Sequence, residues 1–276
     1  MLTKEQCLDA FADIQYHMDE PQSNPSSVPL YFLCQLARQP VTVVLSGEGA
    51  DEIFGGYNVY SEPGGSAYDK LPRGLRRGIG HIAEKMPAHR GRNFLVRKGK
   101  DLEERFIGNA YMFTPEERKA LLKIRTNAPD PMAITKPFYD KVQDQDDVTK
   151  MQYLDLHMWM AGDILLKADK MSMANSLELR VPFLDRKVFE LASHIPTKCK
   201  VNANQTKIAM RGAAEKTIPA KTADKKKLGF PVPVRAWLRD EQYAGIVRKA
   251  FNTPAAEQFF RTKELNAMLD QHISGK

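Results

Sequence analysis

The stretch VTVVLSGEGADEIFGGY, residues 41–57, decides the fold of this 276-residue chain. Its β-branched first part, residues 41–45, is typical of a short buried strand. Gly47 and Gly49 follow at once, and a glycine-rich turn after a strand is where open α/β sheets bind their ligands. The stretch therefore predicts an α/β protein with a ligand-binding loop at the carboxyl end of this strand.

The loop is acidic, which excludes the two common nucleotide motifs. It contains Glu48, Asp51 and Glu52, whereas a Walker loop ends in Lys-Ser or Lys-Thr. A dinucleotide fingerprint would need a third glycine at the position of Glu52. Carboxylates repel phosphate unless a divalent cation lies between them, and Mg²⁺ is held by one or two carboxylates together with phosphate oxygens. The loop is therefore predicted to bind metal and, through the metal, pyrophosphate; a plain solvated turn is the alternative.

Composition places the chain among soluble globular proteins, with 42% hydrophobic residues and room for one large domain or two modest ones. No apolar run is long enough to cross a bilayer, and the N-terminus lacks the blocks of a signal peptide, so a cytoplasmic protein is expected. The three cysteines are far apart and odd in number, which favours neither disulfides nor a zinc site.

The net charge of +7 is concentrated in residues 71–100 and in the run 221–227. Such an excess would suit a polyanionic partner. No nucleic-acid recognition motif accompanies it, so a solvated basic surface is the favoured interpretation and nucleic-acid binding is not predicted.

Apart from residues 41–45, the regular segments of the chain are predicted to be helical, with glycine- and proline-rich loops within residues 61–80 and at 225–237. Helices are predicted in residues 3–18, 28–38, 100–123, 147–179 and 262–273, and another in residues 204–213 with an asparagine cap. One strand among many helices suggests that part of a sheet is missing. On the wheel of residues 147–179, Asp163, Lys167 and Lys170 share a face, whereas Asp169 lies among apolar and small residues and is not expected to be an ordinary solvated charge.

Three stretches occur in a family-specific order: VVLSGEGADEIFGGY at 43–57, LLKADKMSMANSLELRVPFLD at 165–185 and KKKLGFPVPVRAWL at 225–238. Together they resemble the C-terminal synthetase domain of glutamine-dependent asparagine synthetases, over about residues 18–238. The resemblance implies an α/β fold of the PP-loop ATP pyrophosphatase (adenine-nucleotide alpha-hydrolase-like) type. The whole chain, 1–276, would be one such domain, largely helical with a short incomplete parallel sheet.

The implied reaction is the ATP-dependent amidation of aspartate through a β-aspartyl-adenylate, which yields asparagine, AMP and pyrophosphate. Its implied cofactors are ATP and Mg²⁺, and its ammonia would come from a glutaminase domain; a homodimer is possible. Glu48 and Asp51 correspond to the metal carboxylates and Lys227 to the lysine that stabilises charge during catalysis, with Glu48 also counted as catalytic. The nucleotide-binding residues implied by the resemblance are Ser46, Gly47, Glu48, Gly49, Asp51 and Lys227.

Further residues are weaker candidates. Asp169, Glu178 and Arg180 could line the substrate site, although ion pairs that pack helices explain them almost as well. Lys207 and Arg211, four residues apart, could face phosphate, but a surface helix is the better interpretation.

Two features of the complete enzymes are absent from this chain. It begins Met1-Leu2, where the glutaminase uses a terminal cysteine, and it lacks a Ser-Gly-Gly-x-Asp-Ser pyrophosphate loop. It is therefore expected to be a C-terminal portion that is inactive by itself. Two alternatives stay open: a related amidotransferase that acts on a sugar acid or a β-lactam precursor, and a non-catalytic fragment.

Overall fold

The computed structural model describes residues 2–64, 67–87, 89–109, 112–124, 126–225 and 232–275. Lys227 lies outside these ranges. The described part is mostly helical, and its helices are α1 Lys4–Asp9, α2 Phe11–Met18, α3 Ser27–Arg38, α4 Ala50–Phe54, α5 Arg73–Lys85, α6 Arg92–Gly99, α7 Leu102–Arg105, α8 Pro115–Leu121, α9 Pro131–Asp140, α10 Asp147–His157, α11 Leu166–Met173, α12 Arg186–Ser193, α13 Thr197–Lys200, α14 Ile208–Ala214, α15 Ala220–Ala223, α16 Val234–Trp237, α17 Glu241–Phe251, α18 Pro254–Phe259 and α19 Thr262–Ile273. Short 3₁₀ helices span Asn58–Gly64, Ala67–Lys70 and Pro182–Leu184, and a π-helical turn spans Met160–Leu165.

The two strands form a small parallel sheet, in agreement with the prediction of an α/β fold that contains a short parallel sheet. Strand β1, Val43–Leu45, pairs with β2, Glu178–Arg180, so that Val43 lies beside Glu178 and Leu45 beside Arg180. The prediction of a single strand, and of a helix that continues to residue 179, was therefore wrong. The chain leaves α11 through Ser176, whose φ of 53° belongs to the left-handed region, and then extends along β1.

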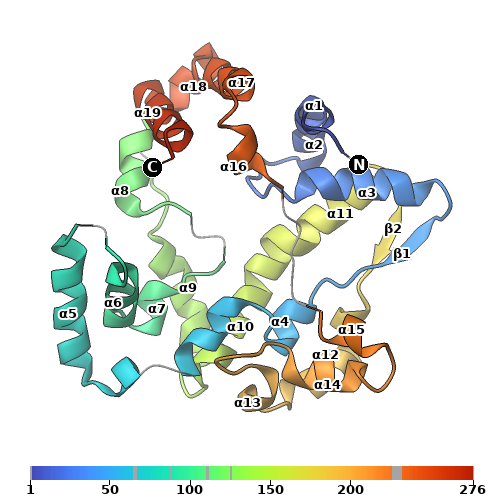
Figure 1. Cartoon of the computed structure of the whole chain (residues 1–276), viewed down its shortest axis with the longest axis vertical. Coiled ribbons are helices and arrows are strands. Elements are labelled where there is room, and N and C mark those ends of the chain that lie inside the picture. The colour runs from blue at the N-terminus through green and yellow to red at the C-terminus, as the bar shows by residue number, and fades with distance from the viewer. Residues whose placement is uncertain are drawn as a thin grey trace.

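Helices α10 and α11 organise the core. Joined by the π-helical turn, they run through the middle of the molecule (Figure 1), where α10 packs against α4 and α9 and α11 packs against α2 and α3. Ile14 and Met171 are buried between α2 and α11, and Met151 and Leu154 of α10 are buried beside Tyr60. Packing therefore holds α4 against α10, and β2 against α11.

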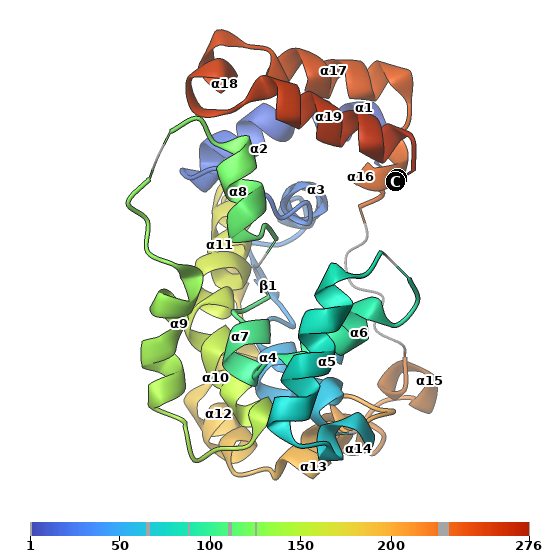
Figure 2. The ribbon, with the colours of Figure 1, turned by 90° about the vertical axis from the view of Figure 1, so that its left-hand side faces the viewer.

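The C-terminal helices α17, α18 and α19 form a layer at one end of the molecule (Figure 2). They touch the N-terminal helices through Lys4 and Asp240, 3.4 Å apart, and a hydrogen bond from the hydroxyl of Tyr243 to Glu5. Helix α19 packs on α8, which begins with the predicted cap: Thr114 and Glu117 form a capping box.

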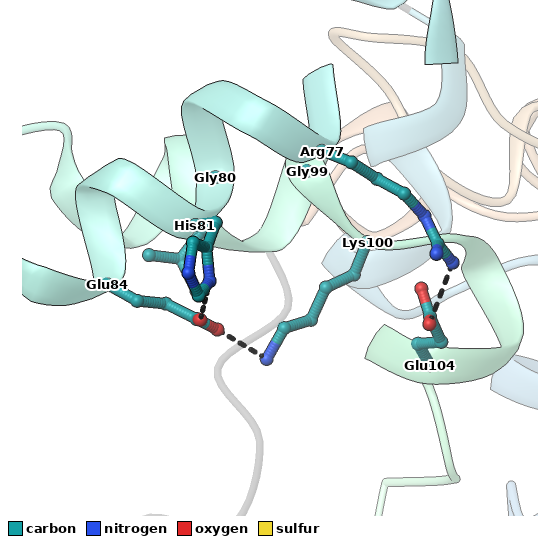
Figure 3. A pocket seen from close by; sticks show the side chains of 8 residues that line it. Arg77, Gly80, His81, Glu84, Gly99, Lys100 and Glu104 are labelled. Carbon is teal, nitrogen blue, oxygen red and sulfur yellow. Dashed lines mark hydrogen bonds and ion pairs between the residues drawn. The ribbon is translucent and has the colours of Figure 1, made fainter. Parts of the chain in front are cut away.

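The basic segment around α5 and α6 is largely neutralised by its own carboxylates. Helices α5 and α6 cross closely at Gly80 and Gly99, where a Cβ on either glycine would lie within 3 Å of the other's Cα. Around this crossing lies a cavity of about 150 Å³, in which Lys100 lies 3.0 Å from Glu84 and Arg77 lies 2.8 Å from Glu104 (Figure 3). Nearby Lys98 is buried and bonded to Asp69. These ion pairs hold α5 and α6 to the segments beside them. The prediction of a solvated basic surface is therefore wrong for Lys98.

The expected asparagine cap of residues 204–213 was also wrong. Helix α14 starts only at Ile208, after Lys207 with a φ of 55°. Residues 202–205 form a turn instead, in which the side-chain oxygen of Asn202 accepts hydrogen bonds from the backbone of Asn204 and Gln205. Among the described residues, no helix is both long and apolar enough to cross a membrane.

Candidate active site

The loop after β1 has the strand-turn-helix form predicted from the sequence. The backbone N–H of Ser46 donates to the carbonyl of Arg180 at 2.8 Å, so the loop leaves the sheet beside the end of β2. Gly49 then takes a φ of 88° before α4. A Cβ at Gly49 would also lie 2.3 Å from the side chain of Leu184, so both backbone conformation and packing require glycine there. Gly47 has open space around it.

Glu48 lies in a cluster of carboxylates. Burial is the largest cause that raises the pKa of its side chain, and the neighbouring charges of Glu52, Asp51 and Asp163 raise it further, while Lys167 lowers it. The carboxylate is therefore half-buried near three other carboxylates and one cation, Lys167.

Asp51 and Lys207 form an ion pair that crosses 156 residues of sequence. The Asp51 Oδ1 lies 3.1 Å from the Lys207 Nζ, and both side chains are mostly shielded from solvent. Gly56 makes room for this contact, because a Cβ there would lie 2.0 Å from the Asp51 Oδ1 and 2.3 Å from the Lys207 Cε. Lys207, which the sequence reasoning placed on a surface helix, lies directly before α14, a helix that buries none of its residues, and there it pairs with Asp51.

The side chain of Arg211 is also mostly shielded from solvent. Its guanidinium donates to the backbone carbonyls of Thr206, Ala223 and Lys225. It therefore fixes the end of α15 and the chain that leads towards Lys227.

Lys167, a buried lysine on α11, also lies near the acidic loop. The Lys167 Nζ donates to the hydroxyl of Ser26 at 2.9 Å and lies 3.7 Å from the Asp163 Oδ1. Asp163 also accepts a 2.7 Å hydrogen bond from the side-chain amide of Asn24. The helical wheel put Asp163 and Lys167 on one face, which is confirmed, but nothing local in the sequence indicated that this face meets Glu48.

Glu52 points into the core. It is 1% exposed, and the hydroxyl of Tyr57 donates to its Oε1 at 2.5 Å. The indole N–H of Trp159 in turn donates to the Tyr57 oxygen at 3.1 Å. Burial, followed by the charge of Glu52, strongly raises the pKa of Tyr57, so this hydroxyl stays a donor. The buried Glu52 side chain therefore fixes α4 to the core.

The three weaker candidates are all exposed. Asp169 is exposed, so the expectation that it is not an ordinary solvated charge was wrong: α11 buries Lys167, Ala168 and Met171 instead. Glu178 and Arg180 are exposed and pair with each other, the Arg180 Nε lying 2.8 Å from the Glu178 Oε1. Arg180 is the last residue of β2 and therefore lies next to the start of the loop.

The donor set at the loop suits a magnesium ion. Glu48 and Asp51 supply carboxylate oxygens, which Mg²⁺ prefers, and the buried Lys167 and the half-buried Lys207 lie close to them. Within the described ranges, no group of three or more acidic, histidine or cysteine side chains forms a complete metal cage.

Comparison with known proteins finds relatives that align with the whole chain. The chain is 42% identical over 278 residues to asparagine synthetase [glutamine-hydrolyzing] 1 of Bacillus subtilis (strain 168), which covers all of this chain and 44% of that protein. It is 41% identical over 280 residues to a putative asparagine synthetase [glutamine-hydrolyzing] of Mycobacterium tuberculosis (strain ATCC 25618 / H37Rv), covering all of this chain and 42% of the relative. Asparagine synthetase [glutamine-hydrolyzing] 3 of Bacillus subtilis is 27% identical over 236 residues, 83% of this chain and 34% of that protein. The chain thus spans less than half the length of these relatives.

A family model described as asparagine synthase matches residues 1–276. This match over the whole chain establishes that the chain belongs to the asparagine synthase family.

Proposed function

We propose that this chain performs the synthetase half-reaction of a glutamine-hydrolysing asparagine synthetase. The observation that carries the proposal is the cluster of Glu48, Asp51 and Lys207 at the carboxyl end of β1, in a member of the asparagine synthase family. The fold would then be that of the PP-loop ATP pyrophosphatases, with residues 1–276 as one synthetase domain.

In this proposal, Glu48 and Asp51 hold the magnesium of the ATP pyrophosphate group. The bound metal would neutralise charge that builds up on the leaving pyrophosphate. Lys207 holds Asp51 in place at 3.1 Å, and Gly56 keeps the space that the pair needs. Ser46, Gly47 and Gly49 let the backbone approach the phosphates closely.

The chemistry would proceed in two balanced steps. An oxygen of the aspartate side-chain carboxylate attacks the α-phosphorus, and the bond to pyrophosphate breaks. Ammonia then attacks the acyl carbon, loses a proton, and AMP leaves. Lys227 is proposed to stabilise the charge that develops during these steps. Arg180, at the end of β2, is proposed to pair with a substrate carboxylate through its planar fork, with Glu178 and Asp169 as weaker candidates.

Two further parts are proposed to come from outside these residues. The glutaminase domain would deliver ammonia, and a second pyrophosphate loop would position the α-phosphate. One exposed face of the two-stranded sheet supports this, because Val43 is 39% and Leu45 73% exposed in a parallel sheet, a type that is normally covered.

The test measures AMP release in the protein with the upstream segments that its full-length relatives carry. Glu48→Ala and Asp51→Ala should each slow aspartate-dependent AMP release strongly, because the metal loses a ligand while the phosphate charge remains. Glu190→Ala is the matched control, since Glu190 is an exposed carboxylate on α12 that pairs only with Arg186 at 2.8 Å among the described residues. Wild-type rates in both loop variants would refute the assignment.

Product analysis separates the alternatives. Asparagine formed from aspartate, ammonia and ATP supports the proposal, whereas AMP formed only with another carboxylic acid would indicate a related amidotransferase. If no substrate gives ATP-dependent AMP, the chain is a non-catalytic fragment.

A further inference from the structure

A chain of two hydrogen bonds joins the π-helical turn to α4. The indole N–H of Trp159 donates to the Tyr57 oxygen at 3.1 Å, and the Tyr57 hydroxyl donates to the Glu52 Oε1 at 2.5 Å. An indole nitrogen can only donate, so the proton of the Tyr57 hydroxyl points to the carboxylate. The two bonds therefore run in one direction, from Trp159 to Glu52, although Trp159 and Tyr57 are 102 positions apart in the sequence.

The two ends of this hydrogen-bond chain lie next to two further carboxylates. Glu52 directly follows Asp51 on α4. Trp159 directly precedes the π-helical turn, which carries Asp163. Such a turn inside a helix is rare and is often found at a functional site. The Tyr57 hydroxyl therefore bridges the helix that carries one carboxylate and the turn that carries the other.

Glu48 lies near both of these carboxylates. The charges of Asp51 and Asp163 each raise the pKa of the Glu48 carboxyl group, and such an effect requires that both side chains are close to it. The surroundings of Glu48 therefore depend on how α4 is placed relative to the π-helical turn. The Tyr57 hydroxyl contacts a group on each side, so it can fix this placement.

The bridge is buried, which makes the loss of its central hydroxyl costly. Glu52 is 1% exposed, and a buried carboxylate that loses a donor is poorly compensated by water. The Tyr57 ring packs edge-on against Tyr60, with the ring centroids 5.5 Å apart, so the ring stays in place without the hydroxyl. The Gln152 side-chain amide also donates to the Glu52 backbone carbonyl. Removal of the hydroxyl should therefore shift α4 without detaching it from α10.

We propose that Tyr57 is a positioning residue for the synthetase reaction. Its hydroxyl fixes α4 relative to the π-helical turn, and thereby fixes Glu48 relative to Asp163. In this proposal Tyr57 does not touch the substrate and acts through its hydrogen bond to Glu52. The inference rests on the proposed function, because it assigns Tyr57 to the arrangement of the site that holds magnesium pyrophosphate.

Tyr57→Phe removes the hydroxyl and keeps the ring. In the protein with the upstream segments that its full-length relatives carry, this change should lower the turnover number for aspartate-dependent AMP release by about tenfold or more, because a displacement of 1 Å in a positioning group costs about a hundredfold. The Michaelis constant for ATP should change less, since the displaced carboxylates act mainly on charge that develops on the leaving pyrophosphate.

Tyr139→Phe is the matched control. Tyr139, on α9, lies in the hydrophobic cluster against which Tyr57 packs; it is 1% exposed and donates its hydroxyl to the Phe106 carbonyl at 2.6 Å. Urea denaturation should show that both variants fold and lose similar stability, because each loses one buried hydroxyl. Tyr139→Phe should keep the wild-type turnover number. Wild-type turnover in Tyr57→Phe, or an equal loss in the two variants, would overturn the proposal.

Hydrogen exchange reports on α4 without any activity. The backbone amides of Ile53 and Gly55 donate within α4 to the carbonyls of Gly49 and Asp51. They should exchange about tenfold faster in Tyr57→Phe than in the equally destabilised Tyr139→Phe, because only the first variant loosens α4. Equal exchange in the two variants would refute the positioning role.

Failure of the proposed function has a different signature. Glu48→Ala and Asp51→Ala would then retain wild-type rates, whatever the exchange of α4 shows. If both of these variants lose activity while Tyr57→Phe keeps it, the proposed function stands and the role of Tyr57 is refuted.

Discussion

The Asp51–Lys207 pair depends on a missing side chain at Gly56, and this dependence can be tested directly. In Gly56→Ala, the new Cβ would lie 2.0 Å from the Asp51 Oδ1, 2.3 Å from the Lys207 Cε and 2.8 Å from the Asp51 Cα. The first two atoms end flexible side chains and can move away. The third belongs to the backbone of α4, so part of the strain cannot be relieved by rotating a side chain.

The magnitude follows from these contacts. Overpacking of this kind costs about 1–3 kcal/mol in the free energy of unfolding. Loss of the partly shielded ion pair adds up to about 1 kcal/mol. We therefore expect Gly56→Ala to destabilise the chain by about 2–3 kcal/mol. Activity of the complete protein should fall by about a hundredfold, because a displacement of 1 Å in a positioning group has that effect.

Urea denaturation of the chain measures the first quantity, with Gly78→Ala as the control. Gly78 lies within α5, and a Cβ there would meet no atom within 4 Å, so alanine should stabilise the helix by about 1 kcal/mol or leave it unchanged. In an Asp51→Ala background, the penalty of Gly56→Ala should shrink, because one clashing atom and the ion pair are already gone. A Gly56→Ala variant as stable as Gly78→Ala would show that the space beside Asp51 is not needed.

Three other outcomes are expected. Asp155 accepts a hydrogen bond from Tyr60, and burial raises the pKa of its carboxyl group from 3.8 to about 7. The folded state therefore holds the proton of this carboxyl group more tightly than the unfolded state does. The free energy of unfolding should fall as the pH rises from about 4 to about 7. Asp155→Asn should remove that slope from urea titrations across the range, and an unchanged slope would contradict the assignment. Lys227→Arg in the complete protein should lower the turnover number more than it raises the Michaelis constant for ATP; a change in the Michaelis constant alone would make Lys227 a binding residue only. The 276-residue chain by itself, given aspartate, ATP, magnesium and ammonia, should make no asparagine, because no other described loop offers a nest for the α-phosphate; steady production of AMP and asparagine would show that a second loop is dispensable.

Local signals in the sequence were sufficient for several elements. The β-branched run at residues 41–45 contains β1, the Thr114 cap starts α8, and residues 262–273 form α19 as predicted. Each of these depends on residues that are close in the chain, such as a cap and its acceptor three positions later. The glycine at position 49 also followed from local geometry, since its positive φ is part of the turn itself.

Only the tertiary structure could decide which distant side chains meet at the loop. Strand β2 was missed because residues 178–180 become extended through hydrogen bonds to β1, 135 positions earlier in register, and no local pattern specifies that partner. Asp169 was misjudged because a helical wheel shows which residues share a face but not which face the neighbouring elements cover. Lys207 and Lys167 reach Asp51 and Glu48 from helices far along the chain. The sequence by itself determined the acidic stretch that follows β1. The packing of α4 against α14 and the position of α11 decided which cations lie near that stretch, because charge placement depends on distances in space that residue spacing does not contain.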